Sequence, residues 1–133
     1  MEAGKNYLII DDDKSNNLLC KIILKKVLGD VEIVSYDNPR HGLAYIQQEY
    51  GSSDTNKPTV LFLDINMPDI SGWELLDIYK DFDAHIHAQF TIYMLSSSVD
   101  AKDKSLAEEN PFVTGFISKP LTRDVIKKLF YER

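Results

Sequence analysis

The sequence predicts an α/β fold in which a five-stranded parallel sheet is covered by helices on both faces. Three observations support this prediction. Short, continuous apolar runs recur along the chain, as expected for strands that are buried on both sides. Segments with apolar residues at helical spacing lie between these runs. Strand and helix therefore alternate through five rounds, which is the order expected for an open parallel sheet.

The size and composition of the chain suit one domain, which we expect to span residues 1–133 with a folded core of about 6–131. Apolar residues make up 44% of the chain, too many for a disordered protein, and the net charge of −6 argues against direct nucleic-acid binding. No apolar run approaches the roughly 18 residues of a membrane helix. Residues 1–5 lack the apolar stretch of a signal peptide, and Cys20 has no second cysteine with which to form an intrachain disulfide. We therefore expect a cytoplasmic protein without a membrane segment.

The apolar runs predict five strands. In chain order they cover residues 7–10, 31–36, 60–63, 92–95 and 115–118. The second and fifth are the weaker signals, and every interval leaves room for a helix. The longest polar stretch, residues 51–57, is expected to be one surface loop.

The first expected helix has apolar residues at helical spacing, and we expect this face to be buried. Its members are Leu18, Leu19, Ile22, Ile23 and Val27. Cys20 lies on the same side, so we expect a buried thiol. Asp13 is a candidate cap for the start of this helix, and Gly29 can end it.

The other four helices are each expected to begin at a residue whose side chain can accept hydrogen bonds from free backbone N–H groups. These residues are Asn38 before Pro39, Ser71 in a capping box with Glu74, Asp100 before a short polar helix that runs through Glu109, and Thr122 before the last helix.

Polar residues follow four of the five expected strands. Asp11 and Asp12 come after the first, Asp64 ends the third, Ser96 ends the fourth, and Lys119 follows the fifth. An Asp run after a strand can be only a turn and a helix cap. In an open parallel sheet, however, ligands bind outside the carboxyl ends of the strands, where all of these residues would meet. The sequence therefore predicts a functional site at this edge.

The residue types at this edge suit an anionic ligand that is bound together with a metal ion. Clustered carboxylates raise one another's pKa unless a cation is present, and Mg²⁺ prefers carboxylate, water and phosphate oxygens. The ammonium of Lys119 and the hydroxyl of Ser96 can bind a further anionic group. A phosphoryl group is the simplest ligand of this kind, and a carboxylate beside it could act as a nucleophile to form an acyl phosphate.

Five short motifs occur in an order and spacing that resemble the receiver domain of two-component response regulators. They are Ile9-Ile10-Asp11-Asp12, Asp64-Ile65-Asn66-Met67-Pro68, Ser71-Gly72, Ser96-Ser97 and Lys119-Pro120. Each motif is weak alone, but together they are specific and cover nearly the whole chain. The resemblance implies a flavodoxin-like, doubly wound five-stranded parallel sheet in the order 2-1-3-4-5.

The resemblance also implies a magnesium site and a phosphoacceptor. Asp64 would accept the phosphoryl group and also contact Mg²⁺. Asp12 would bind Mg²⁺ directly, Asp11 would act mainly through water, and the backbone carbonyl of Asn66 would be a further ligand. Asn66 and Ser98 match positions that tune the lifetime of the acyl phosphate in the family.

Three further roles follow from the resemblance. Ser96 and Lys119 would contact the phosphoryl oxygens, and the bond between Lys119 and Pro120 would be cis. Phe116 occupies the position of the switch aromatic, where many relatives have Tyr, and it has no hydroxyl. Any switching step that needs a hydroxyl donor there is therefore in doubt.

The predicted function is that of a receiver, which takes a phosphoryl group from a sensor histidine kinase onto Asp64 and changes a face that binds an unidentified target protein. We expect no turnover of a separate substrate, so the chain would catalyse only its own phosphorylation and dephosphorylation. The alternative is a phosphorelay intermediate that hands the group to a histidine phosphotransfer protein. The chain ends soon after its last expected helix, so we expect no output domain. If a homodimer forms, we expect its interface on the last two helices.

Two other classes fit the residues less well. An aspartate-nucleophile phosphohydrolase usually has a second Asp two positions after the nucleophile as general acid, but Asn66 stands there. A flavin-binding module needs a donor-rich loop after the first strand, whereas residues 11–13 are all acidic. His85 and His87 could form a metal-binding pair, but we expect an exposed loop there.

Overall fold

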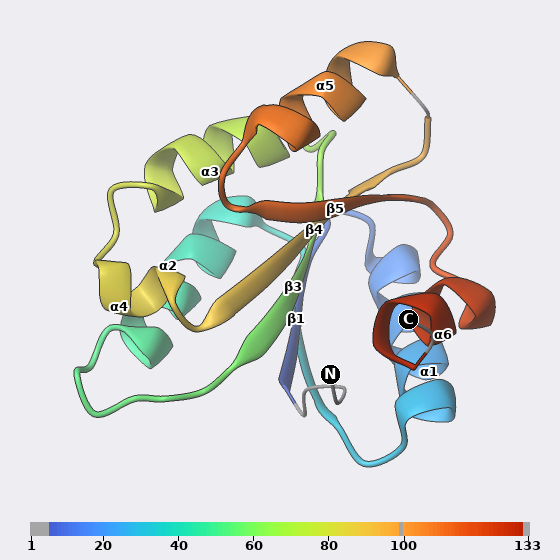
Figure 1. Cartoon of the computed structure of the whole chain (residues 1–133), viewed down its shortest axis with the longest axis horizontal. Helices are drawn as coiled ribbons and strands as arrows, with labels where there is room; N and C mark the ends of the chain where they lie inside the picture. Colours follow the sequence, from blue (N-terminus) through green and yellow to red (C-terminus); the bar gives the residue numbers. More distant parts are fainter. Residues whose placement is uncertain (1–5, 99, 132–133) are drawn as a thin grey trace.

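Five parallel strands form the central sheet, in the order β2-β1-β3-β4-β5, and helices cover both of its faces (Figure 1). The computed structural model describes residues 6–98 and 100–131. The predicted fold class and strand order are confirmed. Residues 1–5, where no signal peptide was expected, lie outside the described part. None of the described helices has both the length and the apolar content that crossing a bilayer requires.

Each strand lies at its predicted segment, with bounds that differ by a few residues, and β2 begins one residue later than predicted. The strands are β1 (Asn6–Ile10), β2 (Glu32–Tyr36), β3 (Thr59–Asp64), β4 (Phe90–Ser96) and β5 (Val113–Ser118). Four of them are longer than the apolar run that predicted them. Backbone pairing with a neighbouring strand extends a strand past its apolar residues, and hydropathy alone does not show this.

Within the described part of the chain, six helices accompany the strands. They are α1 (Lys14–Leu28), α2 (Pro39–Tyr50), α3 (Gly72–Tyr79), α4 (Ala84–His87), α5 (Ala101–Glu109) and α6 (Arg123–Phe130). The side chains of all five predicted capping residues accept hydrogen bonds from backbone N–H groups of the first turn: Asp13, Asn38, Ser71, Asp100 and Thr122. The capping box of Ser71 and Glu74 is complete, because each side chain accepts a hydrogen bond from the other residue's backbone.

Helix α4 was not predicted, and the expected exposed loop around His85 and His87 is wrong. Asp83 caps this single turn, and Ile86 is buried beneath it. One turn is too short to show helical periodicity in a sequence. The ring of His87 packs against Tyr79, and its Nε2 lies 2.8 Å from the backbone oxygen of Tyr79.

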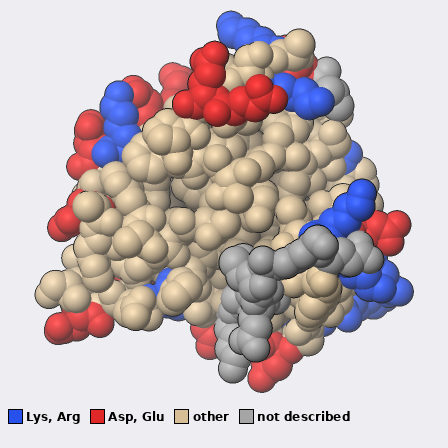
Figure 2. Space-filling view, in the orientation of Figure 1, with Lys and Arg blue, Asp and Glu red and all other residues tan. Residues whose placement is uncertain are grey.

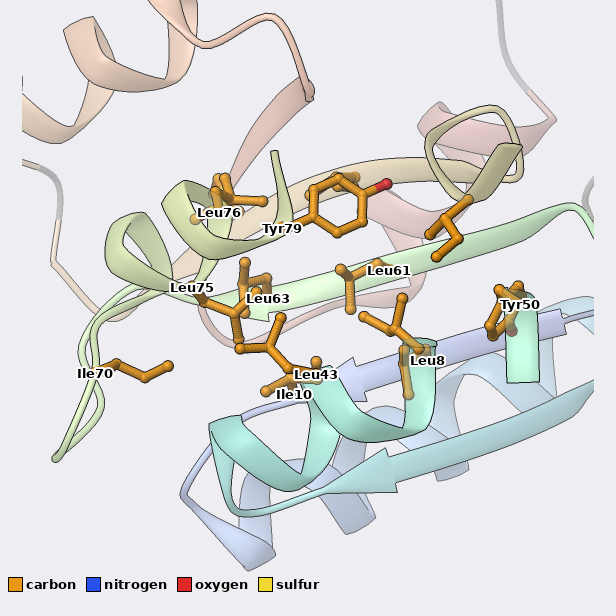
Figure 3. Packing of buried hydrophobic residues seen from close by; sticks show 14 of the residues in the cluster. Leu8, Ile10, Leu43, Tyr50, Leu61, Leu63, Ile70, Leu75, Leu76 and Tyr79 are labelled. Atoms are coloured by element: carbon orange, nitrogen blue, oxygen red, sulfur yellow. The ribbon is translucent and has the colours of Figure 1, made fainter. Parts of the chain in front are cut away.

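One layer of the core lies between the sheet and helices α2, α3 and α4 (Figure 3). Alternate residues of the central strands point into it, because successive side chains of a strand face opposite sides of a sheet. The strand residues are Leu8, Ile10, Leu61, Leu63, Ile92 and Met94. They pack against Leu43, Ile46 and Tyr50 of α2, Leu75, Leu76 and Tyr79 of α3, and Ile86 of α4.

The second layer lies between the opposite face of the sheet and helices α1 and α6. The intervening strand residues point into it, and they include Tyr7, Ile9, Val60, Phe62, Tyr93, Leu95 and Ile117. They pack on Cys20 and Leu24 of α1 and on Ile126 and Phe130 of α6. The prediction that Cys20 is buried is therefore confirmed.

The predicted buried face of α1 is partly wrong. Leu18, Leu19 and Ile22 are 61%, 43% and 45% exposed, whereas Asn17 is buried together with Cys20 and Leu24. The Asn17 amide donates a 2.9 Å hydrogen bond to the backbone oxygen of Asp11, which helps to set the rotation of the helix. The sequence pattern therefore predicted the wrong rotation of α1 about its axis. Leu18, Leu19 and Ile22 form an exposed apolar strip on this helix.

Candidate functional site

Backbone hydrogen bonds align the carboxyl ends of the strands at one edge of the sheet. The Asp11 N–H donates to the Tyr36 oxygen at 3.1 Å, and the Lys119 N–H donates to the Ser96 oxygen at 2.7 Å. Asp64 is paired with Leu95 on the neighbouring strand. The strand order 2-1-3-4-5 therefore brings together residues that are far apart in the sequence, as predicted.

Three carboxylates meet at this edge. Asp11, Asp12 and Asp64 each offer an oxygen, and these oxygens all lie within 4.8 Å of one another. Asp11 and Asp64 are 0% and 3% exposed, whereas Asp12 is exposed. The cluster therefore combines two buried carboxylates with one that faces solvent. Among the residues that the structure describes, it is the only such group of three or more potential metal ligands, and neither His85 nor His87 belongs to it. Hard divalent cations such as Mg²⁺ favour a donor set of this kind.

Lys119 bridges the two buried carboxylates. Its Nζ lies 2.7 Å from Oδ2 of Asp11 and 3.1 Å from Oδ1 of Asp64. Asp11 is also held by the backbone N–H of Asp13 at 2.9 Å and by the amide of Asn16 at 2.7 Å. Asp11 is therefore fixed on both of its oxygens, which makes it the rigid part of the cluster.

Burial and charge shift the pKa of both partners in the ion pair with Asp64. Burial, followed by the neighbouring charge of Asp11, raises the pKa of Asp64 to about 7, although Lys119 opposes the shift. Burial alone would lower the pKa of Lys119, but its hydrogen bonds and ion pairs with Asp11 and Asp64 outweigh burial and raise it. An additional cation would favour the ionised form of Asp64 for the same electrostatic reason.

Ser96 is fully buried at the end of β4, and its hydroxyl donates a 2.7 Å hydrogen bond to the backbone oxygen of Ser98. Ser98 itself is exposed, as is Asn66 in the segment after Asp64. Phe116 of β5 is half-buried and packs against the core layer of α2, α3 and α4. The peptide bond between Lys119 and Pro120 is cis.

The segment between Asp64 and α3 is packed closely against the strand. The Gly72 N–H donates to the Ile65 oxygen at 2.8 Å. A Cβ atom on Gly72 would lie only 2.5 Å from the backbone oxygen of Asp64, so glycine is needed here for close approach. Helix α3 therefore begins in direct contact with the backbone of Asp64.

The sequence analysis missed two residues that hold Asp11 and one exposed ion pair to the segment after Asp64. Asn16 and Asn17 both bind Asp11. Two polar residues in the first turn of a helix that follows an acidic loop are a sequence signal that could have identified them. Arg40 forms an ion pair with Asp69, with 2.7 Å between Nε and Oδ2. Asp69 has a φ of 72°, which is typical of a turn. The preceding Pro68 indicates this turn in the sequence, but nothing in the local sequence indicates that Arg40 is the partner of Asp69.

Comparison with known proteins agrees with this geometry. The sequence profile of the response regulator receiver domain matches residues 7–131. A two-component response regulator from Cytophaga hutchinsonii has a similar structure, with a TM-score of 0.85 and 30% identity over 96% of this chain and 95% of that chain. A two-component response regulator from Legionella pneumophila has a TM-score of 0.74 and 26% identity over 95% of each chain.

Two curated relatives are longer than the region that matches. The 3',5'-cyclic-nucleotide phosphodiesterase regA of Dictyostelium discoideum is 29% identical over 123 residues, which are 91% of this chain but 14% of that protein. Response regulator Rcp1 of Synechocystis is 28% identical over 72 residues, which are 54% of this chain and 49% of that protein. The chain therefore spans less than two thirds of either relative, and the phosphodiesterase activity is a property of that protein alone.

Proposed function

The chain belongs to the response regulator receiver domain family, and we propose that it accepts a phosphoryl group on Asp64 in a reaction that depends on Mg²⁺. One observation carries this proposal: Asp64 lies beside Asp11, Asp12 and Lys119 at the carboxyl edge of a parallel sheet. Paired carboxylates for a cation, a carboxylate nucleophile and an ammonium for the phosphoryl oxygens are the groups that this chemistry needs.

The proposed step is an in-line displacement at phosphorus. A carboxylate oxygen of Asp64 attacks the phosphorus of a phosphohistidine, and the bond from phosphorus to the imidazole nitrogen breaks. The electron pair of that bond remains on the imidazole, which then takes up a proton from water. Lys119 lies 3.1 Å from Asp64 and supplies a fixed positive charge for the phosphoryl oxygens. Burial and the charge of Asp11 raise the pKa of Asp64 to about 7, and Lys119 opposes this rise, so its ammonium helps to keep the nucleophile ionised.

Four groups of this chain would hold the metal ion: the carboxylates of Asp11, Asp12 and Asp64 and the backbone carbonyl of Asn66. Mg²⁺ would supply charge neutralisation for the carboxylates and for the phosphoryl oxygens. The exposed position of Asp12 supports entry of the ion from solvent.

We further propose that phosphorylation redirects the hydroxyl of Ser96. In the structure this hydroxyl is bound to the oxygen of Ser98, and a phosphoryl oxygen on Asp64 would be a stronger, charged acceptor. Phe116, which is half-buried, would then move further inward. Asn66 and Ser98 are the positions where we expect substitutions to change the lifetime of the acyl phosphate.

The proposed phosphodonor is a sensor histidine kinase or a histidine phosphotransfer protein. Helix α1, which follows Asp11 and Asp12 in the chain, carries four lysines and no acidic residue, and Leu18, Leu19 and Ile22 are exposed on it. Several Lys and Arg side chains gather over α1 and α6 in Figure 2. We propose that the donor docks here through a surface that combines apolar and acidic residues.

The remaining parts of the proposal are a cytoplasmic location, a single domain with a core of about 6–131, and no turnover of a separate substrate. A relay role would require onward transfer from Asp64 to a histidine phosphotransfer protein. A homodimer, if it forms, would use the last two helices, α5 and α6. Light scattering with and without phosphodonor measures that association.

The experiment that tests the function is an intact-mass measurement after incubation with acetyl phosphate and Mg²⁺. We expect the wild type to gain one phosphoryl group and Asp64→Asn to gain none. Chelation of Mg²⁺ should abolish the gain. Equal labelling of the wild type and Asp64→Asn would contradict the assignment of Asp64.

A further inference from the structure

Helix α5 packs against β5, but its side chains form few polar interactions with other elements. Of its nine residues only Ala107 is buried, and most of the others are polar and exposed. Trp73 of α3 donates a 2.9 Å hydrogen bond from Nε1 to Oδ1 of Asp103 in the first turn of α5. Within residues 6–98 and 100–131, no other hydrogen bond or ion pair joins a side chain of α5 to another helix or strand.

Trp73, the donor of this hydrogen bond, is held in a fixed position relative to the phosphoacceptor. It directly follows Gly72, which contacts the backbone oxygen of Asp64 and donates to the Ile65 oxygen. The capping box at Ser71 fixes the first turn of α3. The backbone of Trp73 is therefore anchored to the phosphoacceptor strand and not to α5.

Asp103, the acceptor, follows the site closely along the chain, because only a short segment separates the end of β4 from α5. The end of β4 carries Ser96, whose hydroxyl binds the oxygen of Ser98, and α5 begins soon afterwards at its cap Asp100. If Ser96 turns toward a phosphoryl group on Asp64, it loses its hydrogen bond to the oxygen of Ser98, which precedes the cap of α5 by two residues. Asp103 is then free to leave Trp73.

The space between α3 and α5 allows such a movement. A groove of about 340 Å³ lies there, lined by Trp73, Leu76, Leu106 and Phe112 among others. A close-packed interface would resist sliding of one helix over the other, whereas an open groove spanned by a single hydrogen bond does not.

We propose that the hydrogen bond between Trp73 and Asp103 is a latch that holds α5 in the unphosphorylated arrangement and opposes phosphorylation of Asp64. This inference rests on the proposed function. Coupling between two sites is reciprocal, so loss of the latch must favour phosphorylation by the same factor as phosphorylation weakens the latch. The net contribution of one typical protein hydrogen bond sets that factor at about fivefold.

The test measures the affinity of the full chain for beryllofluoride, a mimic of the phosphoryl group, in the presence of Mg²⁺. Asp103→Ala removes the acceptor, and Trp73→Phe removes the donor but keeps an aromatic ring. Asp103→Asn is the matched control, because it removes the charge but keeps an acceptor oxygen. We expect both latch variants to bind beryllofluoride about fivefold more tightly, and Asp103→Asn to bind as the wild type does.

Two further measurements separate the latch from other effects of these substitutions. In a Trp73→Phe background, Asp103→Ala should add nothing, since the bond is already absent. Trp73 is the single tryptophan of the chain, so its fluorescence reports the bond directly. We expect the free Asp103→Ala variant to emit like the beryllofluoride complex of the wild type.

The outcomes distinguish the latch from the proposed function. Suppose that the wild type binds beryllofluoride and that folded Asp103→Ala and Trp73→Phe bind it with the same affinity. This result would overturn the latch but not the proposed function. Additive effects of the two substitutions would also overturn the latch, because each would then act separately. A wild type that does not bind beryllofluoride would overturn the proposed function and the latch with it.

Discussion

Lys119 and Asp64 form an ion pair at the carboxyl edge of the sheet, with 3.1 Å between Nζ and Oδ1, although 54 residues lie between them in the sequence. The same ammonium lies 2.7 Å from Asp11. One cation thus balances two carboxylates that are buried from solvent. This relationship explains why both the acidity of Asp64 and its reactivity should depend on Lys119.

Replacing Lys119 by Met should abolish most self-phosphorylation while leaving a folded protein. The substitution removes the positive charge that faces the phosphoryl oxygens and leaves Asp11 and Asp64 without their counter-ion. We expect the initial rate with acetyl phosphate to fall about 100-fold or more, as for loss of a charged group at a transition state. Lys119→Arg keeps the charge and is the control. A rate for Lys119→Met within a few-fold of wild type would contradict this role.

The stability of the metal-free protein should fall as the pH rises from about 4 to about 7, through the contribution of Asp64. In the unfolded chain its pKa is about 3.9, whereas in the folded protein it is raised to about 7. Between these values the folded state holds a proton that the unfolded state has lost, so each pH unit lowers the free energy of unfolding by about 1.4 kcal/mol. Above about 7 both states are ionised and the contribution stays constant.

This pH dependence is measured as the difference in unfolding free energy between Asp64→Asn and the wild type. The difference should grow in favour of Asp64→Asn as the pH rises, because an amide does not ionise. Mg²⁺ should reduce it, since a cation favours the ionised Asp64. A difference that does not change between pH 4 and pH 7 would show that Asp64 titrates normally.

Gly72→Ala should destabilise the protein by about 2 kcal/mol or more, as expected for overpacking in a close contact. The added Cβ would lie 2.5 Å from the backbone oxygen of Asp64, which cannot move away as a flexible side chain can. Ser105→Ala, on the exposed side of α5, is a control that should be nearly neutral. Urea unfolding measures both. We also expect slower phosphorylation of Gly72→Ala, because the displaced atoms belong to Asp64.

The exposed apolar strip of α1 should matter for a protein phosphodonor but not for a small one. Leu18→Ser and Ile22→Ser remove side chains that are 61% and 45% exposed, so the free energy of unfolding should change by less than about 1 kcal/mol. Phosphotransfer from the cognate kinase should weaken at least tenfold, whereas labelling by acetyl phosphate should not change.

Ile78→Ser is the matched control for these α1 variants. Ile78 is 38% exposed on α3, away from α1, so its replacement should leave both reactions unchanged. If Leu18→Ser and Ile22→Ser transfer phosphate from the kinase as well as Ile78→Ser does, the donor docks elsewhere.

The sequence by itself determined the parts of this protein that depend on local pattern. Continuous apolar runs specified the strands, and capping residues such as Asn38 and Ser71 specified where helices begin. The positions of Asp11, Asp64, Ser96 and other polar residues at strand ends were enough to predict their convergence, because all parallel strands end at one edge.

Only the tertiary structure decided the features that depend on distant contacts. The rotation of α1 that exposes Leu18, the turn of α4, and the hydrogen bond from Trp73 to Asp103 all come from packing between elements. A hydropathy pattern records whether a residue is apolar, but it does not record which of two similar faces meets the sheet. Burial and neighbouring charge also shift the pKa of Asp64, and both exist only after the chain has folded.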